Sequence, residues 1–211
     1  GCLSLPLAGA EAAIPGASAA GRGAPVDGPV SKLINFNPEV LLAMWALPGV
    51  VDGFGSFDNR ALLGRETVGA GARAGSGPVG RGAGDAASWN PAAQVAEMAA
   101  AGFAAIKMWE GKPDYQAALG ITLDDPRLLE AYAEAGRRKM PVLIHVADPA
   151  LFWERGGGPW SYVGRQVPSF EELIRQAELV CREAPGTTFI FPHLLFLADD
   201  IDRMARFIST H

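Results

Sequence analysis

The chain has 211 residues, of which 49% are hydrophobic and 19% charged, and this composition is that of a globular protein able to bury a core. Its net charge is −5 and its basic residues form no cluster, which argues against a groove for nucleic acid. No apolar run approaches the roughly 20 residues of a membrane-spanning helix, so no membrane span is expected.

Residues 1–30 are expected to form a lead-in outside the folded domain. The segment GCLSLPLAGAEAAIPGASAAG is rich in Ala, Gly and Leu, and Glu11 is its only charged residue. It reads either as a flexible leader or as the remnant of an export signal, because LAGA and ASA resemble small-residue cleavage sites. Both readings stay open, and with them a cytoplasmic or an exported location.

Residues 31–211 are expected to form one domain in which apolar strands alternate with helices. Helix starts are indicated where a capping side chain precedes a proline or a capping box, at Asn37-Pro38, Asn90-Pro91, Asp125-Pro126 and Ser169. A further helix is indicated by apolar spacing from Ile201 to Ile208. The expected strands are Lys32–Phe36, Val50–Asp58, Phe103–Trp109, Pro141–Val146 and Thr187–His193.

Two segments interrupt or end this pattern. From Gly64 to Gly84 the chain has eight glycines and no apolar period, which predicts a long flexible loop. The sequence RFISTH ends inside a predicted helix with no closing Gly or Pro, so the domain is expected to be incomplete.

Alternating helices and apolar strands indicate a parallel sheet covered by helices. Both a barrel and an open doubly wound sheet fit this pattern. No GxGxxG or GxxxxGK[ST] motif comes directly after any of the expected strands, so the nucleotide-binding form of the open sheet lacks its usual mark.

Three successive strands carry chemically active side chains near their carboxyl ends: Lys107, His145 and His193. In a barrel of parallel strands these ends converge on one mouth, where active sites lie. A strand end fixes an imidazole as metal binding or proton transfer requires, and the nearby Asp148 could set its tautomer. The pattern therefore predicts a site at this edge of the sheet.

Each of these residues also has a simpler interpretation. A single histidine that ends a strand is more often a core or loop residue, and Lys107 could form a salt bridge instead of contacting substrate. Asp148 could only cap a turn. The aromatic residues nearby either line an apolar pocket or pack over the mouth of the barrel: Trp109, Phe152, Trp153 and Trp160. Glu110, Asp114 and Asp124 are expected to be solvated loop charges.

Three segments carry a family resemblance: GFAAIKMWEG, DDPRLLEAYAEAGRRKMPVLIHVADPALFW and PSFEELIRQAELVCREAPGTTFIFPHL. They resemble the amidohydrolase-related family of metal-dependent barrel hydrolases over residues 90–211. The resemblance implies part of a (β/α)8 TIM barrel, without its first and last strands, and one divalent metal ion, usually zinc.

The resemblance also implies roles for individual residues. His145 matches the family's metal ligand on the fifth strand, and His193 matches the sixth-strand histidine that orients or deprotonates the attacking water, or binds metal in dinuclear relatives. Lys107 ends the preceding strand, where some distant relatives use a carboxylated lysine. Lys107, Asp148 and Trp109 are expected to bind substrate or support the site.

The sequence departs from the family pattern at two ligand positions. No His-x-His pair, which normally ends the first strand, occurs in the chain, and the eighth-strand aspartate would lie beyond His211. The chain alone is therefore expected to bind metal poorly and to be inactive.

The function that the resemblance implies is metal-dependent hydrolysis of a C–N or C–O bond in a small molecule. A decarboxylase on the same scaffold and a non-catalytic binding protein derived from the barrel are the alternatives. The expected partner is a small-molecule substrate, without nucleic acid, and assembly into a homo-oligomer stays open.

Overall fold

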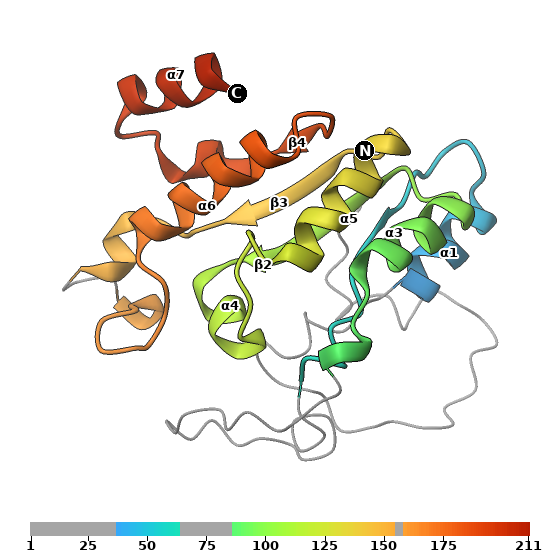
Figure 1. Cartoon of the computed structure of the whole chain (residues 1–211), viewed down its shortest axis with the longest axis horizontal. Coiled ribbons are helices and arrows are strands. Elements are labelled where there is room, and N and C mark those ends of the chain that lie inside the picture. The colour runs from blue at the N-terminus through green and yellow to red at the C-terminus, as the bar shows by residue number, and fades with distance from the viewer. Residues whose placement is uncertain (1–36, 64–85, 155–157) are drawn as a thin grey trace.

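The computed structural model describes residues 37–63, 86–154 and 158–211, and the described chain is an α/β protein built on a four-stranded parallel sheet (Figure 1). The strands follow one another in chain order, without reversal, and every neighbouring pair is parallel. Their bounds are β1 Phe54–Gly55, β2 Ala105–Gly111, β3 Val142–Val146 and β4 Phe189–Ile190. The prediction of a parallel sheet is confirmed.

Helices lie between the strands along the chain, and α3, α5 and α6 lie along one side of the sheet (Figure 1). The α-helices are α1 Asn37–Ala46, α3 Pro91–Ala100, α4 Pro113–Leu119, α5 Pro126–Arg137, α6 Phe170–Glu183 and α7 Ile201–Thr210. The short 3₁₀ turns are η3 Ala86–Ser88, η4 Ala150–Trp153, η5 Gly158–Trp160 and η6 Pro192–Phe196.

Capping side chains start the helices where the sequence predicts them. Asn90 accepts a hydrogen bond from the backbone N–H of Ala93, and Asp125 accepts one from that of Arg127. Ser169 accepts one from the backbone N–H of Glu172 at the start of α6. Each cap satisfies an N–H that a helix start leaves without an intrahelical partner.

The two faces of the sheet differ in burial. On the helix-covered face, Ile106, Met108 and Ile144 are fully buried and join the main hydrophobic core. The side chains of Lys107 and Leu143, which are paired in register across β2 and β3, alternate with these and are only half-buried. Lys107 and Leu143 therefore lie on the other face, which we call the open face.

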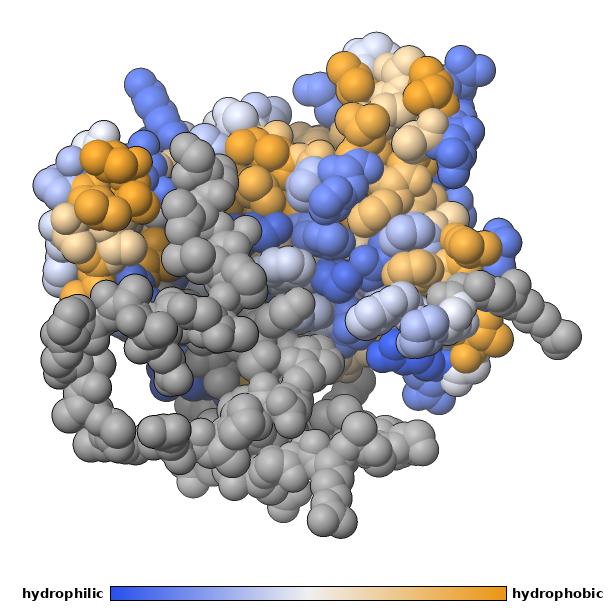
Figure 2. Space-filling view, turned by 180° about the vertical axis from the view of Figure 1, so that it is seen from behind, coloured by the Kyte–Doolittle hydropathy of each residue, from blue (hydrophilic) through white to orange (hydrophobic). Residues whose placement is uncertain are grey.

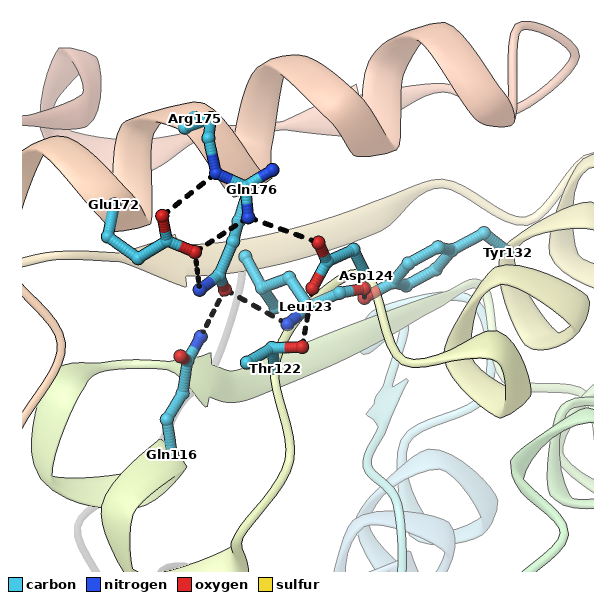
Figure 3. A network of polar contacts seen from close by, with 8 residues as sticks. All are labelled: Gln116, Thr122, Leu123, Asp124, Tyr132, Glu172, Arg175 and Gln176. Carbon is cyan, nitrogen blue, oxygen red and sulfur yellow. Dashed lines mark hydrogen bonds and ion pairs between the residues drawn. The ribbon is translucent and has the colours of Figure 1, made fainter.

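A polar network fastens α6 to α4 and to the segment before α5 (Figure 3). Gln176 of α6 is completely buried, and its side-chain oxygen accepts hydrogen bonds from Gln116 Nε2 at 2.8 Å and from the backbone N–H of Leu123 at 3.1 Å. Its Nε2 donates to Glu172 at 3.1 Å. Asp124 pairs with Arg175 at the edge of this network, so its role is structural, where the sequence predicted a loop charge.

Several expected elements differ from those observed. β1 and β4 have two residues each, and His193 lies in η6 beyond β4 because Pro192 has no N–H for a ladder and four left-handed residues follow. The sequence predicted a loop where α4 forms; this helix ends at Gly120, whose φ of 68° allows a left-handed cap. The expected strand Lys32–Phe36, the lead-in 1–30 and the loop 64–84 lie outside the described residues.

Exposed apolar side chains gather at two places, over α1 and around α7 (Figure 2). They include Leu42 and Trp45 of α1 and Ile201 and Ile208 of α7. In the part of the chain that the structure describes, no helix has the length and apolar character needed to cross a membrane.

Candidate functional site

Four rings meet where β2, β3 and η6 come together at the carboxyl edge of the sheet. The ring of His145, from β3, lies with its centroid 5.4 Å from that of Trp109 in β2 and 5.2 Å from that of His193. Phe196 lies 5.7 Å from His145 and stacks on His193 at 5.1 Å. The structure thus brings the two predicted histidines and Trp109 together, and it adds Phe196.

His145 is held in this cluster with one ring nitrogen unpaired. The residue is 8% exposed, and its buried Nε2 makes no hydrogen bond of good geometry with any described residue, although Asp148 Oδ1 lies 3.4 Å away. Burial lowers the pKa of His145 below its usual value, an effect that Asp148 opposes and the charges of Lys112 and Lys107 strengthen. The imidazole is therefore neutral at pH 7 and has a nitrogen available to a ligand.

Asp148 is fixed by two donors that bridge distant parts of the chain. Lys112 Nζ donates to both carboxylate oxygens at 2.6 and 2.7 Å, and the Tyr162 hydroxyl donates to Oδ2 at 2.6 Å. Burial alone would raise the pKa of Asp148, but its contacts with His145, Lys112 and Tyr162 outweigh burial and hold it below the ordinary value. A carboxylate anion therefore faces the His145 ring.

Lys107 lies on the open face of β2, two residues before Trp109. Its Nζ is 4.5 Å from the centroid of the Trp109 ring, a cation–π distance. Burial lowers the pKa of Lys107 to about 8, with Glu110 opposing and Lys112 reinforcing the shift. The salt bridge considered for Lys107 does not form with any described carboxylate, whereas Lys112, which the sequence did not single out, forms one.

His193 occupies an unusual backbone conformation. His193, Leu194, Leu195 and Phe196 all have φ between 51° and 60°, in the left-handed region that non-glycine residues rarely adopt. This left-handed turn leaves His193 exposed while it packs Phe196 against the His145 and His193 rings. The neighbouring Ala147, after β3, also has a φ of 60°. Backbone strain therefore concentrates at the candidate site.

An irregularity in β2 shapes the same edge. The register of β2 and β3 shifts between Met108 and Gly111, so Trp109 and Glu110 form a bulge. Glu110 is buried, accepting from Asn59 Nδ2 at 2.6 Å and from the Trp109 N–H at 2.8 Å, and burial raises its pKa. The prediction that Glu110 is a solvated loop charge is therefore wrong.

Close approach of β2 and β3 requires Gly111. A Cβ at this position would lie 2.3 Å from the carbonyl oxygen of His145, too close for any side chain. The Gly111 carbonyl accepts a hydrogen bond from the Ala147 N–H at 3.0 Å. Gly111 therefore determines how closely the backbone of His145 lies against β2.

The other predicted residues contribute less directly. Trp153 packs on Tyr162 at 4.8 Å and so supports the phenol that holds Asp148, with Phe152 at 6.2 Å from the same ring. Trp160 is largely exposed. Asp114 is half-buried beside Lys112, and burial raises its pKa. These positions form the surroundings of the site.

The residues present fit one part of a metal site. The unpaired, buried Nε2 of the neutral His145 is a suitable donor, and the exposed His193 is adjacent. Asp148 is already engaged by Lys112 and Tyr162. Among the described residues, no group of three or more His, Cys, Asp or Glu side chains could hold an ion. His145 thus fits as a single ligand, and a complete ligand set is not assembled by the described chain.

A hollow of about 560 Å³ lies elsewhere, between α1 and α3. None of the candidate residues lines it; its lining residues include Asp58, Trp89 and Gln94. The candidate residues therefore lie at the sheet edge and not in this hollow. No model of a known protein family and no curated protein sequence matches the chain.

Proposed function

We propose that the chain carries part of the active site of a metal-dependent hydrolase that acts on a C–N or C–O bond of a small molecule. The observation that carries this proposal is the neutral, buried His145, whose Nε2 has no hydrogen-bond partner among the described residues. Its ring packs against that of His193, which lies in η6 directly after the next strand, β4. A fixed imidazole beside an exposed one is what metal binding and proton transfer require of neighbouring residues.

The fold supports placing these residues in a partial (β/α)8 barrel. Four parallel strands follow chain order, and a doubly wound sheet would need a reversal of that order. Helices cover one side, while the open face bears Lys107, Leu143 and His145. Active sites of barrels lie at the carboxyl ends of the strands, which is where both histidines lie.

In this proposal His145 is a metal ligand through Nε2, and Asp148 Oδ1, 3.4 Å from the same nitrogen, lies beside the donor atom. His193, exposed at the site, transfers a proton to or from the reacting group. Lys107 and Trp109 contact the substrate. When bound, a divalent metal such as zinc supplies a Lewis acid and an activated water. The remaining ligands would come from chain outside the described residues.

Turnover by the full-length protein tests the role of His193. His193→Ala should keep its zinc but lose roughly 10²–10⁴-fold in kcat, the usual contribution of a positioned acid or base. Loss of zinc together with activity would make His193 a ligand instead. Assaying CO₂ release alongside amide and ester hydrolysis separates the hydrolase from a decarboxylase on the same scaffold.

A further inference from the structure

Two buried polar side chains, Asn59 and Glu110, join the segment after β1 to β2. Asn59 is 1% exposed and Glu110 4%, and Asn59 Nδ2 donates to Glu110 Oε1 at 2.6 Å. Strand pairing between β1 and β2 ends where Gly55 pairs with Ile106. The hydrogen bond between the two side chains therefore connects these segments beyond the point where the ladder stops. We call Asn59 and Glu110 the clamp.

The clamp fixes the backbone of Trp109. Glu110 Oε2 accepts a hydrogen bond from the Trp109 N–H at 2.8 Å, and the Trp109 carbonyl accepts one from the Lys112 N–H at 2.9 Å. Trp109 and Glu110 lie in the bulge, where the register with β3 is interrupted. A bulge disrupts the ladder locally, and here the Glu110 side chain supplies the acceptor for the Trp109 N–H. The position of the Trp109 ring therefore depends on Glu110.

The Trp109 ring transmits this dependence to His145. The two rings stack with their centroids 5.4 Å apart and 19° between their planes. A change in the bulge would therefore move the ring against which His145 packs.

Stability alone does not explain a carboxyl group at position 110. Burial raises the pKa of Glu110, and the described chain provides no ion pair for it. An apolar side chain of similar volume would avoid the cost of burying a polar or charged group. The carboxyl group supplies what such a side chain cannot, namely two acceptor atoms, one for Asn59 and one for the Trp109 N–H.

We propose that Asn59 and Glu110 are positioning residues of the candidate site, whose hydrogen bonds hold Trp109 so that its ring keeps His145 oriented for metal binding. This role rests on the proposed function, in which His145 is a ligand. The clamp acts through hydrogen-bond geometry and not through charge. In Glu110→Gln the new amide can accept from the Trp109 N–H and donate to Asn59 Oδ1, which has no partner among the described residues, once the Asn59 amide turns over.

The ring protons of His145 in the metal-free full chain test the positioning by NMR. Their signals are the ones absent from His145→Ala, and the Trp109 ring current should shift them in the parent. Glu110→Leu removes both acceptors at similar volume and should move these signals toward those of Trp109→Leu, in which the ring is gone. Glu110→Gln should keep the parent positions. Glu130→Leu should also keep them, since it is a control that removes a carboxylate from an exposed position of α5.

The zinc affinity of the full-length protein, measured by competition with a chelator, gives a second readout. Glu110→Leu should weaken zinc binding by roughly 10–100-fold, the usual effect of losing a group that orients a metal ligand. Glu110→Gln and Glu130→Leu should keep the parent affinity.

Four results would overturn the proposal: parent-like His145 signals in folded Glu110→Leu, unchanged zinc affinity in that variant, equal effects of Glu110→Gln and Glu110→Leu, or fast hydrogen exchange of the Trp109 N–H in the parent. The exchange measurement needs no variant, so it decides even if Glu110→Leu does not fold. A parent that binds no zinc would contradict the proposed function alone, because the ring-proton and exchange measurements are made without metal.

Discussion

The Nε2 atom of His145 lies 3.4 Å from Oδ1 of Asp148, and the two residues are held by different contacts. His145 is fixed by β3 and by stacking on Trp109, whereas Asp148 is fixed by Lys112 and Tyr162. The carboxylate can therefore keep its place independently of the ring that it faces. The carboxylate favours the protonated ring, but burial lowers the pKa of His145 by more and keeps the imidazole neutral at pH 7.

Asp148→Asn should lower the free energy of unfolding by about 1–3 kcal/mol, because Lys112 and Tyr162 lose a charged acceptor in a buried site. Urea denaturation at pH 7 measures this. Glu183→Gln is the control: it removes a charge from the exposed pair with Arg182 and should change the free energy by less than about 0.5 kcal/mol. Equal effects of the two substitutions would show that Asp148 is an ordinary surface charge.

The effect of Asp148→Asn should depend on pH in a defined direction. The pKa of Asp148 in the folded chain is lowered from 3.8, so the unfolded chain binds more protons between the two pKa values. The stabilisation is therefore fully present above about pH 4 and is lost as the pH falls through the folded pKa. The difference in free energy of unfolding between the parent and Asp148→Asn should therefore become smaller as the pH falls.

Lys107 should react with amine reagents at a lower pH than an ordinary lysine does. Its pKa is lowered from 10.5 to about 8, so half of it is neutral and nucleophilic near pH 8. Modification rates read by peptide mass spectrometry across pH should therefore have a midpoint near 8 in the folded chain. In urea the midpoint of the same residue should rise toward 10.5. A midpoint that does not change on unfolding would contradict the buried environment of Lys107.

Gly111→Ala should destabilise the chain by roughly 1–3 kcal/mol, because the new Cβ would meet the His145 carbonyl oxygen at 2.3 Å and push β2 from β3. Thermal and urea unfolding measure the loss. Gly186→Ala is the matched control, since a Cβ there meets no atom within 4 Å. If both variants are equally stable, the two strands do not approach each other as closely as the structure describes.

Local signals in the sequence were sufficient for much of the fold. The side chains of Asn90, Asp125 and Ser169 each cap a helix by accepting a hydrogen bond from a backbone N–H two or three residues later. The mostly apolar run Val142–Val146 forms a largely buried strand, as its composition predicts. His145 and His193 could be placed together because successive parallel strands end at one edge.

The parts that could not be predicted depend on contacts between distant residues. Lys112 and Asp148 are 36 residues apart, and no spacing rule connects them or adds Tyr162. The burial of Glu110 follows from a bulge that only pairing with β3 reveals. The left-handed turn that begins at His193 opposes the local preference of four non-glycine residues, so tertiary packing has to maintain it.

The central claim is that His145 is a metal ligand, and the zinc content of the full-length protein tests it most directly. Elemental analysis should find about one zinc per chain in the parent and in His211→Ala, a control that removes the third histidine of the sequence, whose ring contacts Phe207. His145→Ala should lose most of this zinc, because the site would lose an imidazole that the fold holds in place for it. Stoichiometric zinc in purified, folded His145→Ala would contradict the account and leave His145 a structural residue.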